Sequence, residues 1–224
     1  MNLTLYHSFY ITYAFLVTTG TITFIESLRT QIEPMRHILN LETCISIVAA
    51  FFYGNFINTL KEKKDHIDDE TLQNEINDNR YVDWSITTPI MLVVLVLGFR
   101  YNAGLKSIKF NDILLILFLN YGMLGSGYLG EKNVIQKPIA NIIGFVFFAF
   151  LYGFLYNTYL LKTKGGNNPS NQLLYFSFLI LWALYGVFYL MKENVKNAGY
   201  NILDLFSKCF VGIYFWTYSS KIFG

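Results

Sequence analysis

Four ionisable residues in this chain are spaced so that they could hold a charged lysine in a buried position. Asp204 and Lys208 are four residues apart, and Arg80 and Asp83 are three residues apart. Residues at these spacings lie on one face of an α-helix, so each pair would share a surface. Opposite charges close together favour each other's charged forms. The two pairs therefore predict a charge cluster with acid–base chemistry, provided that their helices meet.

The segments that must position these residues are long and apolar. Hydrophobic residues make up 54% of the 224-residue chain and charged residues 14%, whereas a soluble domain carries about 25% charged residues. A membrane-spanning helix needs about 20 mainly apolar residues. Seven segments meet this requirement, at residues 4–27, 38–60, 80–99, 110–130, 138–161, 172–191 and 199–222. Because backbone polar groups in lipid must be paired internally, we predict an all-α membrane protein, a seven-helix bundle with one domain over residues 1–224.

Composition also argues against other classes of protein. The net charge is only +2, and no basic run interleaves with aromatic residues, so we expect no nucleic-acid partner. Cys44 and Cys209 lie inside apolar segments, and neither has metal-ligand spacing to another Cys or His. We therefore expect no metal site, and we interpret both cysteines as buried small hydrophobic residues.

Five ionisable residues lie inside the predicted spans and away from their ends: Glu42, Arg80, Asp83, Asp204 and Lys208. Ionisable groups inside a membrane are costly and indicate function. At 1.5 Å per residue, Asp204 would lie roughly 7 Å and Lys208 roughly 13 Å below one surface, with Asp83 close to the depth of Asp204. A lysine converted to a protonated imine would keep its charge there, and the two carboxylates would balance it. Ion pairs that only pack the helices are the alternative.

Three stretches of the chain resemble the microbial rhodopsins. RYVDWSITTPIML (80–92) resembles their third-helix signature, LDLFSKCF (203–210) resembles the seventh-helix motif with the retinal lysine, and WALYGVFY (182–189) resembles the sixth-helix aromatic block. The short chain and the acid on its second helix most resemble the group-II rhodopsins of large DNA viruses. This resemblance implies a viral protein that forms a pentamer and transports protons or acts as an ion channel, and not an enzyme.

The resemblance also implies a role for each matching residue. Lys208 would carry all-trans retinal as a covalent Schiff base, Asp83 would be the primary counterion and proton acceptor, and Asp204 the second counterion. Arg80 would respond to their charge, and Thr87 would hydrogen-bond to Asp83. The retinal pocket would include Trp84, Thr88, Met91, Met123, Gly127, Trp182, Tyr185, Tyr189 and Ser207. For any single aromatic residue, ordinary helix packing is the alternative.

The chain departs from the family pattern at two places. Its sixth helix has Gly186 and Tyr189 where Pro and Trp are frequent, and its fifth helix lacks a Trp. The pocket is therefore expected to be looser, or filled by Phe, on that side. Glu193 matches one of the two outer glutamates of archaeal pumps, but Lys196 stands at about the second position. This lysine puts a proton-release pair in doubt.

The usual proton-donor position, eleven residues after Asp83, is occupied by Val94. Glu42 on the second helix lies at a similar depth, because each residue is about six positions, or roughly 9 Å, from the same end of the bundle. Burial disfavours an isolated charge, so the Glu42 carboxyl would rest protonated, as a donor must. We therefore expect Glu42 to be the proton donor. An acid that faces headgroups or pairs with Arg36 is the alternative.

These residues favour a light-driven outward proton pump. Asp83 argues against a chloride pump, which needs a neutral residue there, and Thr87 stands where the usual sodium pump has Asp. A light-gated ion channel is the second hypothesis, either through the protomer or along the axis of an oligomer ringed by Arg29 and Arg36. Ordinary anchoring at the inner surface is the alternative for these two arginines. A photosensor that signals to a partner is the third hypothesis.

Orientation follows only weakly from charge. Lysines and arginines are divided almost evenly between the two sides, but the 61–79 link is rich in acidic residues, which favours the exterior. We therefore expect an integral membrane protein with an extracellular N-terminus and a cytoplasmic C-terminus. If the protein is viral, the lipid bilayer would be a membrane of the host cell.

Overall fold

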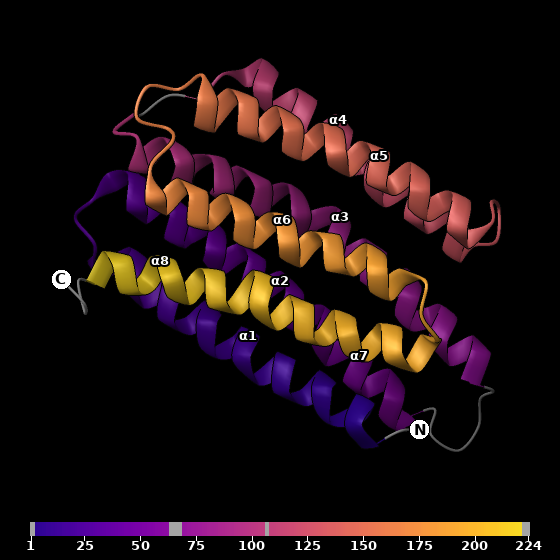
Figure 1. The fold of residues 1–224 in the computed structure, drawn as a ribbon. Coiled ribbons are helices and arrows are strands. Elements are labelled where there is room, and N and C mark those ends of the chain that lie inside the picture. The colour runs from indigo at the N-terminus through magenta and orange to yellow at the C-terminus, as the bar shows by residue number, and fades with distance from the viewer. Residues whose placement is uncertain (1–2, 63–68, 106–107, 221–224) are drawn as a thin grey trace.

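The computed structural model describes residues 3–62, 69–105 and 108–220, which form seven helical runs lying side by side (Figure 1). The N-terminus and the C-terminus lie at opposite ends of this bundle, which we call its N-terminal end and its C-terminal end. The runs are α1 (Leu3–Arg29), α2 (Glu33–Glu62), α3 (Asp69–Asn102), α4 (Phe110–Glu131), α5 (Lys137–Leu155) with the π-helical η1 (Tyr156–Leu161), α6 (Pro169–Tyr189), and a seventh made of α7 (Glu193–Asp204), the π-helical η2 (Leu205–Phe210) and α8 (Val211–Ser220).

The predicted all-α seven-helix bundle is confirmed. Within the described residues, six runs are long and apolar enough to cross a membrane. The seventh run is divided by η2, and it carries Asp204 and Lys208 in its middle. A π-helical segment holds an extra residue in its turn, and such segments are frequent at functional sites. The span that departs most from regular apolar helix is therefore the one with the candidate lysine.

Several helices begin earlier than predicted, and α3 and α7 do so by the most. The helix α3 begins at Asp69, well before residue 80, so a large part of the predicted 61–79 link is helical. The helix α7 begins at Glu193 and not near residue 199. Acidic residues suit a helix N-terminus because they face the positive end of the helix dipole. Hydropathy locates only the part of a helix that lies in lipid, so it misses these polar turns.

The side chains are distributed as expected for a protein in lipid. Large apolar side chains are exposed on the outer surface, for example Ile11, Phe118 and Phe150, whereas several charged side chains are buried inside. Cys209 is buried, but Cys44 is exposed, so the prediction that both are buried was wrong for Cys44. The reason is that an apolar residue on a membrane helix can face either lipid or the interior.

Two apolar clusters leave a polar layer between them. Near the N-terminal end, Phe9, Phe56 and Ile76 belong to one buried cluster. Toward the C-terminal end, Met91 and Phe99 belong to the other. The interior of α3 therefore passes from apolar to charged and back to apolar, with Arg80 and Asp83 between Ile76 and Met91. This arrangement removes water from the charged layer.

Candidate functional site

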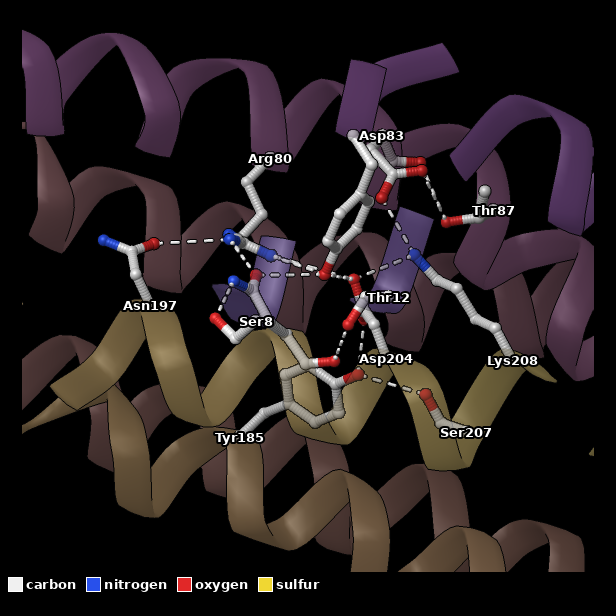
Figure 2. Close-up of polar contacts among 12 residues, drawn as sticks. Ser8, Thr12, Arg80, Asp83, Thr87, Tyr185, Asn197, Asp204, Ser207 and Lys208 are labelled. Carbon is white, nitrogen blue, oxygen red and sulfur yellow. Dashed lines mark hydrogen bonds and ion pairs between the residues drawn. The ribbon is translucent and has the colours of Figure 1, made fainter. Parts of the chain in front are cut away.

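Lys208 is the centre of the buried charge layer. Its Nζ atom lies 2.8 Å from Oδ2 of Asp83 and 3.3 Å from Oδ2 of Asp204, and all three side chains are buried (Figure 2). Asp83 comes from α3, whereas the other two come from the seventh run. The helix spacing on each run therefore places two carboxylates at one amine, as the sequence suggested.

Each carboxylate has a distinct set of further partners. Thr87, one turn along α3, donates its hydroxyl to Oδ1 of Asp83 at 3.3 Å and to the backbone oxygen of Asp83 at 2.9 Å. Asp204 instead accepts hydrogen bonds from the hydroxyls of Tyr185 at 2.6 Å and Tyr53 at 2.9 Å. Hydrogen bonds from such donors favour the charged form of a carboxylate. Asp204 is thus the more firmly held of the two.

Arg80 completes the charge balance of the layer. Its Nη1 atom lies 3.7 Å from Oδ2 of Asp204, and its Nη2 atom donates to Oδ1 of Asn201 at 2.8 Å. Five aromatic rings surround the guanidinium carbon, with centroid distances from 5.2 to 6.0 Å: Phe9, Tyr53, Phe56, Trp84 and Tyr200. Two cationic and two anionic side chains are therefore buried together in one region. A buried charge is tolerated only when it is paired in this way.

A cavity extends from Lys208 between α3, α4, α5 and α6. All nine residues predicted for the retinal pocket line this cavity, and so do Asp204 and Lys208. The predicted residues are Trp84, Thr88, Met91, Met123, Gly127, Trp182, Tyr185, Tyr189 and Ser207. The walls are mainly apolar and aromatic, with Thr88 and Asn141 as polar exceptions away from the charged end at Lys208. An elongated apolar molecule with an aldehyde at one end fits such a cavity, because the amine would be within its reach.

The α5 wall of the cavity was not assigned from sequence. Phe145 and Phe148 line the cavity there, on the side where a Trp is missing, together with the small residue Gly144. A Cβ atom added to Gly186 on α6 would lie 2.6 Å from the ring of Phe145, so the phenylalanine occupies space that a larger residue at 186 would need. The missing Trp of the fifth helix and the small Gly186 of the sixth helix therefore compensate each other, because Phe145 fills the space beside Gly186. Tyr81, inside the third-helix motif but not assigned to the pocket, and Asn141, outside the quoted motifs, also line the cavity.

Glu42 lies apart from the charge layer, toward the C-terminal end of the bundle. Its side chain is buried, and among the described residues its Oε2 atom has no hydrogen-bond partner. The neighbouring backbone is that of Gly212 on α8, where an added Cβ would lie 3.3 Å from this oxygen. Arg36 is exposed and donates to the backbone oxygen of Thr30 at 3.2 Å. Glu42 is thus an interior acid and not one at the surface of the bundle.

A second ionic cluster occupies the N-terminal end of the bundle. Lys196 is buried, and its Nζ atom lies 2.7 Å from Glu131 and 2.9 Å from Glu193. Lys137 contacts the same two acids, at 3.0 and 3.1 Å. Burial disfavours the charge of Glu193, but hydrogen bonds from Lys196, Asn77 and Lys137 outweigh it and lower the pKa of Glu193. Because two lysines contact both Glu131 and Glu193, this cluster does not form a pair of acids that share a proton.

Comparisons with known proteins agree with this geometry. The family described as bacteriorhodopsin-like proteins matches residues 4–222. The crystal structure of the viral rhodopsin OLPVRII is 59% identical, with a TM-score of 0.88 over 98% of this chain and 99% of that one. The proton-pumping rhodopsin AR2 from the marine alga Acetabularia acetabulum is 20% identical, with a TM-score of 0.74 over 100% of this chain and 97% of that one, and so shows a shared fold alone.

A more distant curated relative is the green-light absorbing proteorhodopsin of Gamma-proteobacterium EBAC31A08. It is 24% identical over 157 residues, which are 63% of this chain and 61% of that protein. The match thus spans about three fifths of the length of this relative. The family match over residues 4–222 and the 59% identity to a viral rhodopsin are decisive. The chain belongs to the bacteriorhodopsin-like family, the microbial rhodopsins, and it resembles a viral member of that family at 59% identity.

Proposed function

We propose that the protein is a light-driven outward proton pump with all-trans retinal bound to Lys208 as a Schiff base. The observation that carries the proposal is the placement of Lys208 Nζ, 2.8 Å from the Asp83 carboxylate, at the closed end of an apolar cavity. The family implies retinal, and the cavity residues suit a polyene of that kind. When bound, retinal would supply light absorption and an isomerisation that displaces the proton on Nζ.

Asp83 is the proposed proton acceptor. Its Oδ2 atom already accepts a hydrogen bond from Lys208 Nζ, so proton transfer needs little movement of the carboxylate. Thr87 holds the other oxygen, Oδ1, and so leaves Oδ2 directed at the lysine. Asp204 accepts hydrogen bonds from two tyrosines and lies beside Arg80, so both of its oxygens already have partners other than Lys208. The second counterion would therefore stabilise the cation at rest without taking its proton.

Glu42 is the proposed proton donor to Lys208 Nζ. A buried carboxyl without a charged partner is far less costly when it is neutral, and a neutral carboxyl has a proton to give. Val94, at the position of the usual donor, is buried in the apolar cluster and offers no proton. Acceptor and donor would thus lie toward opposite ends of the bundle from the lysine, which gives transport its direction.

In this proposal the N-terminal end of the bundle faces the exterior and the C-terminal end the cytoplasm. The proton leaves by the side of Asp83 and is replaced from the side of Glu42. The 61–79 link, which the sequence shows to be rich in acidic residues, would then lie outside. Because the chain is 59% identical to a viral rhodopsin, the membrane would be one of the host cell.

A light-gated ion channel is the second candidate, and a photosensor with a signalling partner the third. The channel is favoured by Arg29, which is exposed on the side of α1 near the C-terminal end and could line the axis of a pentamer. Its exposure also suits contact with lipid headgroups. Transport through the protomer is the better-supported candidate, since the interior carries an acceptor and a proposed donor.

Voltage clamp of cells that express the protein distinguishes a pump from a channel. A pump predicts outward photocurrent at zero voltage and with equal ion concentrations on both sides, without reversal over the accessible voltages. A channel predicts a photocurrent that reverses near the equilibrium potential of its ion. Asp83→Asn is the control, because it should abolish a pump current while the retinal band remains. A reversing current in the wild-type protein would overturn the pump.

A further inference from the structure

A stripe of buried polar residues runs along α1 toward its C-terminal end. Thr19, Thr23, Glu26 and Thr30 are buried, and their spacing of four, three and four residues places them on one helix face. Polar groups that face the interior of a membrane protein are costly and mark pathways for ions or protons. None of these residues has a role in the pump as described so far.

The outer part of this stripe borders a polar cavity of about 310 Å³ at the C-terminal end of the bundle. Its rim includes the exposed residues Arg29 and Gln31, whereas Glu26 and Ser219 line it and are buried. Ser219 of α8 donates its hydroxyl to Oε1 of Glu26 at 3.2 Å. A cavity of this size with polar walls can hold several waters. Glu26 is therefore a buried acid at the inner side of a water-accessible mouth.

The inner part of the stripe reaches Glu42. Thr23 shares a hydrogen bond of 2.9 Å with the hydroxyl of Thr43 on α2, the residue after Glu42. A Cβ atom added to Gly212 would lie 3.3 Å from Oε2 of Glu42 and 3.5 Å from a methyl group of Thr23. The carboxyl of Glu42 and the side chain of Thr23 thus both lie next to Gly212. Glu42 is the buried acid at the inner end of the stripe.

Glu26 and Thr23 are three residues apart on α1, so about 4.5 Å separates them along the helix axis. One bridging water spans such a gap, and water-mediated hydrogen bonds are nearly as favourable as direct ones. Buried oxygens near Glu42 lack such partners: among the described residues, neither Ser46 Oγ nor Glu42 Oε2 makes a hydrogen bond. The stripe therefore has unused hydrogen-bonding capacity where a proton would pass.

The alternative path to the same depth, along α3, is filled with apolar side chains. Val94 and Phe99 are buried in the apolar cluster, together with Leu174 and Phe215. A Cβ atom on Gly98 would lie 3.1 Å from the Phe215 ring and 3.3 Å from Leu174, so these side chains pack directly onto the α3 backbone. Within the described part of α3, residues 94–99 therefore carry no polar side chain that could pass a proton.

We propose that the cavity between α1 and α8 is the proton entrance and that Glu26 relays protons from it to Glu42. Glu26 takes one proton from water in the cavity and passes one, through water and the hydroxyls of Thr23 and Thr43, to the Glu42 carboxylate left after each transfer. Glu26 ends each cycle in the state in which it began. This inference rests on the proposed donor role of Glu42, and it moves the uptake path from the third helix to the first two helices and α8.

Two measurements on the full-length protein in bilayers test the relay. The first is the rate at which deuterium from D₂O reaches the Glu42 carboxyl in the dark, followed by its infrared band, which Glu42→Gln identifies. The second is light-induced proton uptake, followed with a pH-indicator dye and compared with reprotonation of Lys208 Nζ. Glu26→Gln should slow both the deuterium exchange and the uptake, whereas the preceding transfer from Glu42 to Nζ should keep its rate.

We expect uptake in Glu26→Gln to slow about tenfold, less than the roughly 100-fold contributed by a well-placed proton-transfer group, because water still reaches the cavity. Azide, a small weak acid, should restore the rate. Thr23→Val should also slow the exchange, since it removes one hydroxyl of the path. The matched control is Glu33→Gln, which removes the same charge from an exposed position on α2 at the same end of the bundle.

The outcomes separate the relay from the donor. Unchanged exchange and uptake in both Glu26→Gln and Thr23→Val, with an intact retinal band, would overturn the relay. An equal slowing in Glu33→Gln would also overturn it, because surface charge alone would then explain the effect. If Glu42→Gln leaves reprotonation of Nζ unchanged, the donor assignment fails and the relay to it fails as well, whatever Glu26→Gln does.

Discussion

The two ends of the bundle interior use ionisable residues in opposite ways. Toward the N-terminal end, buried charges lie against opposite charges: Lys208 contacts Asp83 and Asp204, and Lys196 contacts Glu131 and Glu193. Toward the C-terminal end, Glu42 is equally buried, but within the described chain its Oε2 atom has no hydrogen-bond partner and no ion pair to Glu42 is present. The first region is held together by ion pairs, although Nε of Arg80 has no hydrogen-bond partner there, and the second region has no ion pair to its buried acid among the described residues.

This difference teaches how one fold can prepare an acceptor and a donor from the same kind of side chain. A carboxylate that faces cations rests ionised and can take up a proton, as Asp83 would. A carboxyl buried among apolar groups rests neutral and can give one, as Glu42 would. Pairing also fixes geometry, which suits a site that binds a chromophore. Unsatisfied groups instead leave room for transient water, which suits proton uptake.

The largest effect is expected from Lys208→Ala. Removal of the amine removes the attachment point, so the visible absorption band should be lost on addition of all-trans retinal, while circular dichroism still reports a helical protein. Lys196→Met tests the comparison directly, because this second buried lysine lies outside the cavity lining and its loss should leave the band in place. Retention of the band in Lys208→Ala without an added free amine would contradict the assignment.

Asp83→Asn should abolish transfer of the proton from Lys208 Nζ. The neutral amide cannot take the proton, and the loss of a positioned proton acceptor costs roughly 100-fold or more in rate. The absorption maximum should also move to the red, because a nearby anion stabilises the ground-state cation more than the excited state. Asp112→Asn is the matched control, since Asp112 accepts from Tyr159 far from Lys208 along the chain. A wild-type spectrum and photocycle in Asp83→Asn would refute the acceptor role.

Much of the paired region could be predicted from the sequence. The i, i+3 and i, i+4 spacings and the three motifs placed Arg80, Asp83, Asp204 and Lys208 together, and the nine pocket residues line one cavity. Glu42 could be placed by depth alone. What depth could not give was its neighbours on other helices, such as Gly212, because helix rotation in an apolar bundle is not encoded in local spacing.

Other parts of the site carried no sequence signal. The hydroxyl of Tyr53 contacts Asp204, and the amide of Asn201 contacts Arg80. Tyr53 lies on a helix without a recognised motif, and Asn201 lies outside the motif quoted for the seventh helix. The polar start of α3 was missed because hydropathy detects lipid contact and not helix. Such features depend on contacts between helices, which only the three-dimensional arrangement fixes.

A smaller effect is expected at the outer ionic cluster. Lys196→Met leaves the buried Glu131 and the partly exposed Glu193 short of a partner. Breaking the buried pair with Glu131 costs about 3 kcal/mol of unfolding free energy, the lower end of the usual range, since Lys137 remains. The matched control is Lys132→Met, whose pair with Asp78 is exposed, so that its loss should cost about 1 kcal/mol or less. Equal losses of thermal stability in the two variants would contradict a structural role for the buried cluster.

The smallest effect concerns pH. Although burial opposes its charge, hydrogen bonds from Lys196, Asn77 and Lys137 lower the pKa of Glu193 below its ordinary value of 4.5. A group whose pKa is lowered in the folded state stabilises it above the unfolded-state value and loses this contribution as pH falls through the folded-state value. The melting temperature should therefore decline below about pH 4.5, and Glu193→Gln should reduce that decline. An identical pH profile in the variant would rule out this contribution.

The proposed cycle requires Glu42 to resupply the proton that Asp83 removes from Lys208 Nζ. Glu42→Gln tests this requirement most directly. Flash photolysis should show that Lys208 Nζ still loses its proton to Asp83 at the wild-type rate. Its reprotonation should slow by about 100-fold or more, as expected for loss of a placed donor, become dependent on bulk pH, and recover in part with azide. Reprotonation at the wild-type rate in Glu42→Gln would contradict the account, because the proton would then come from elsewhere.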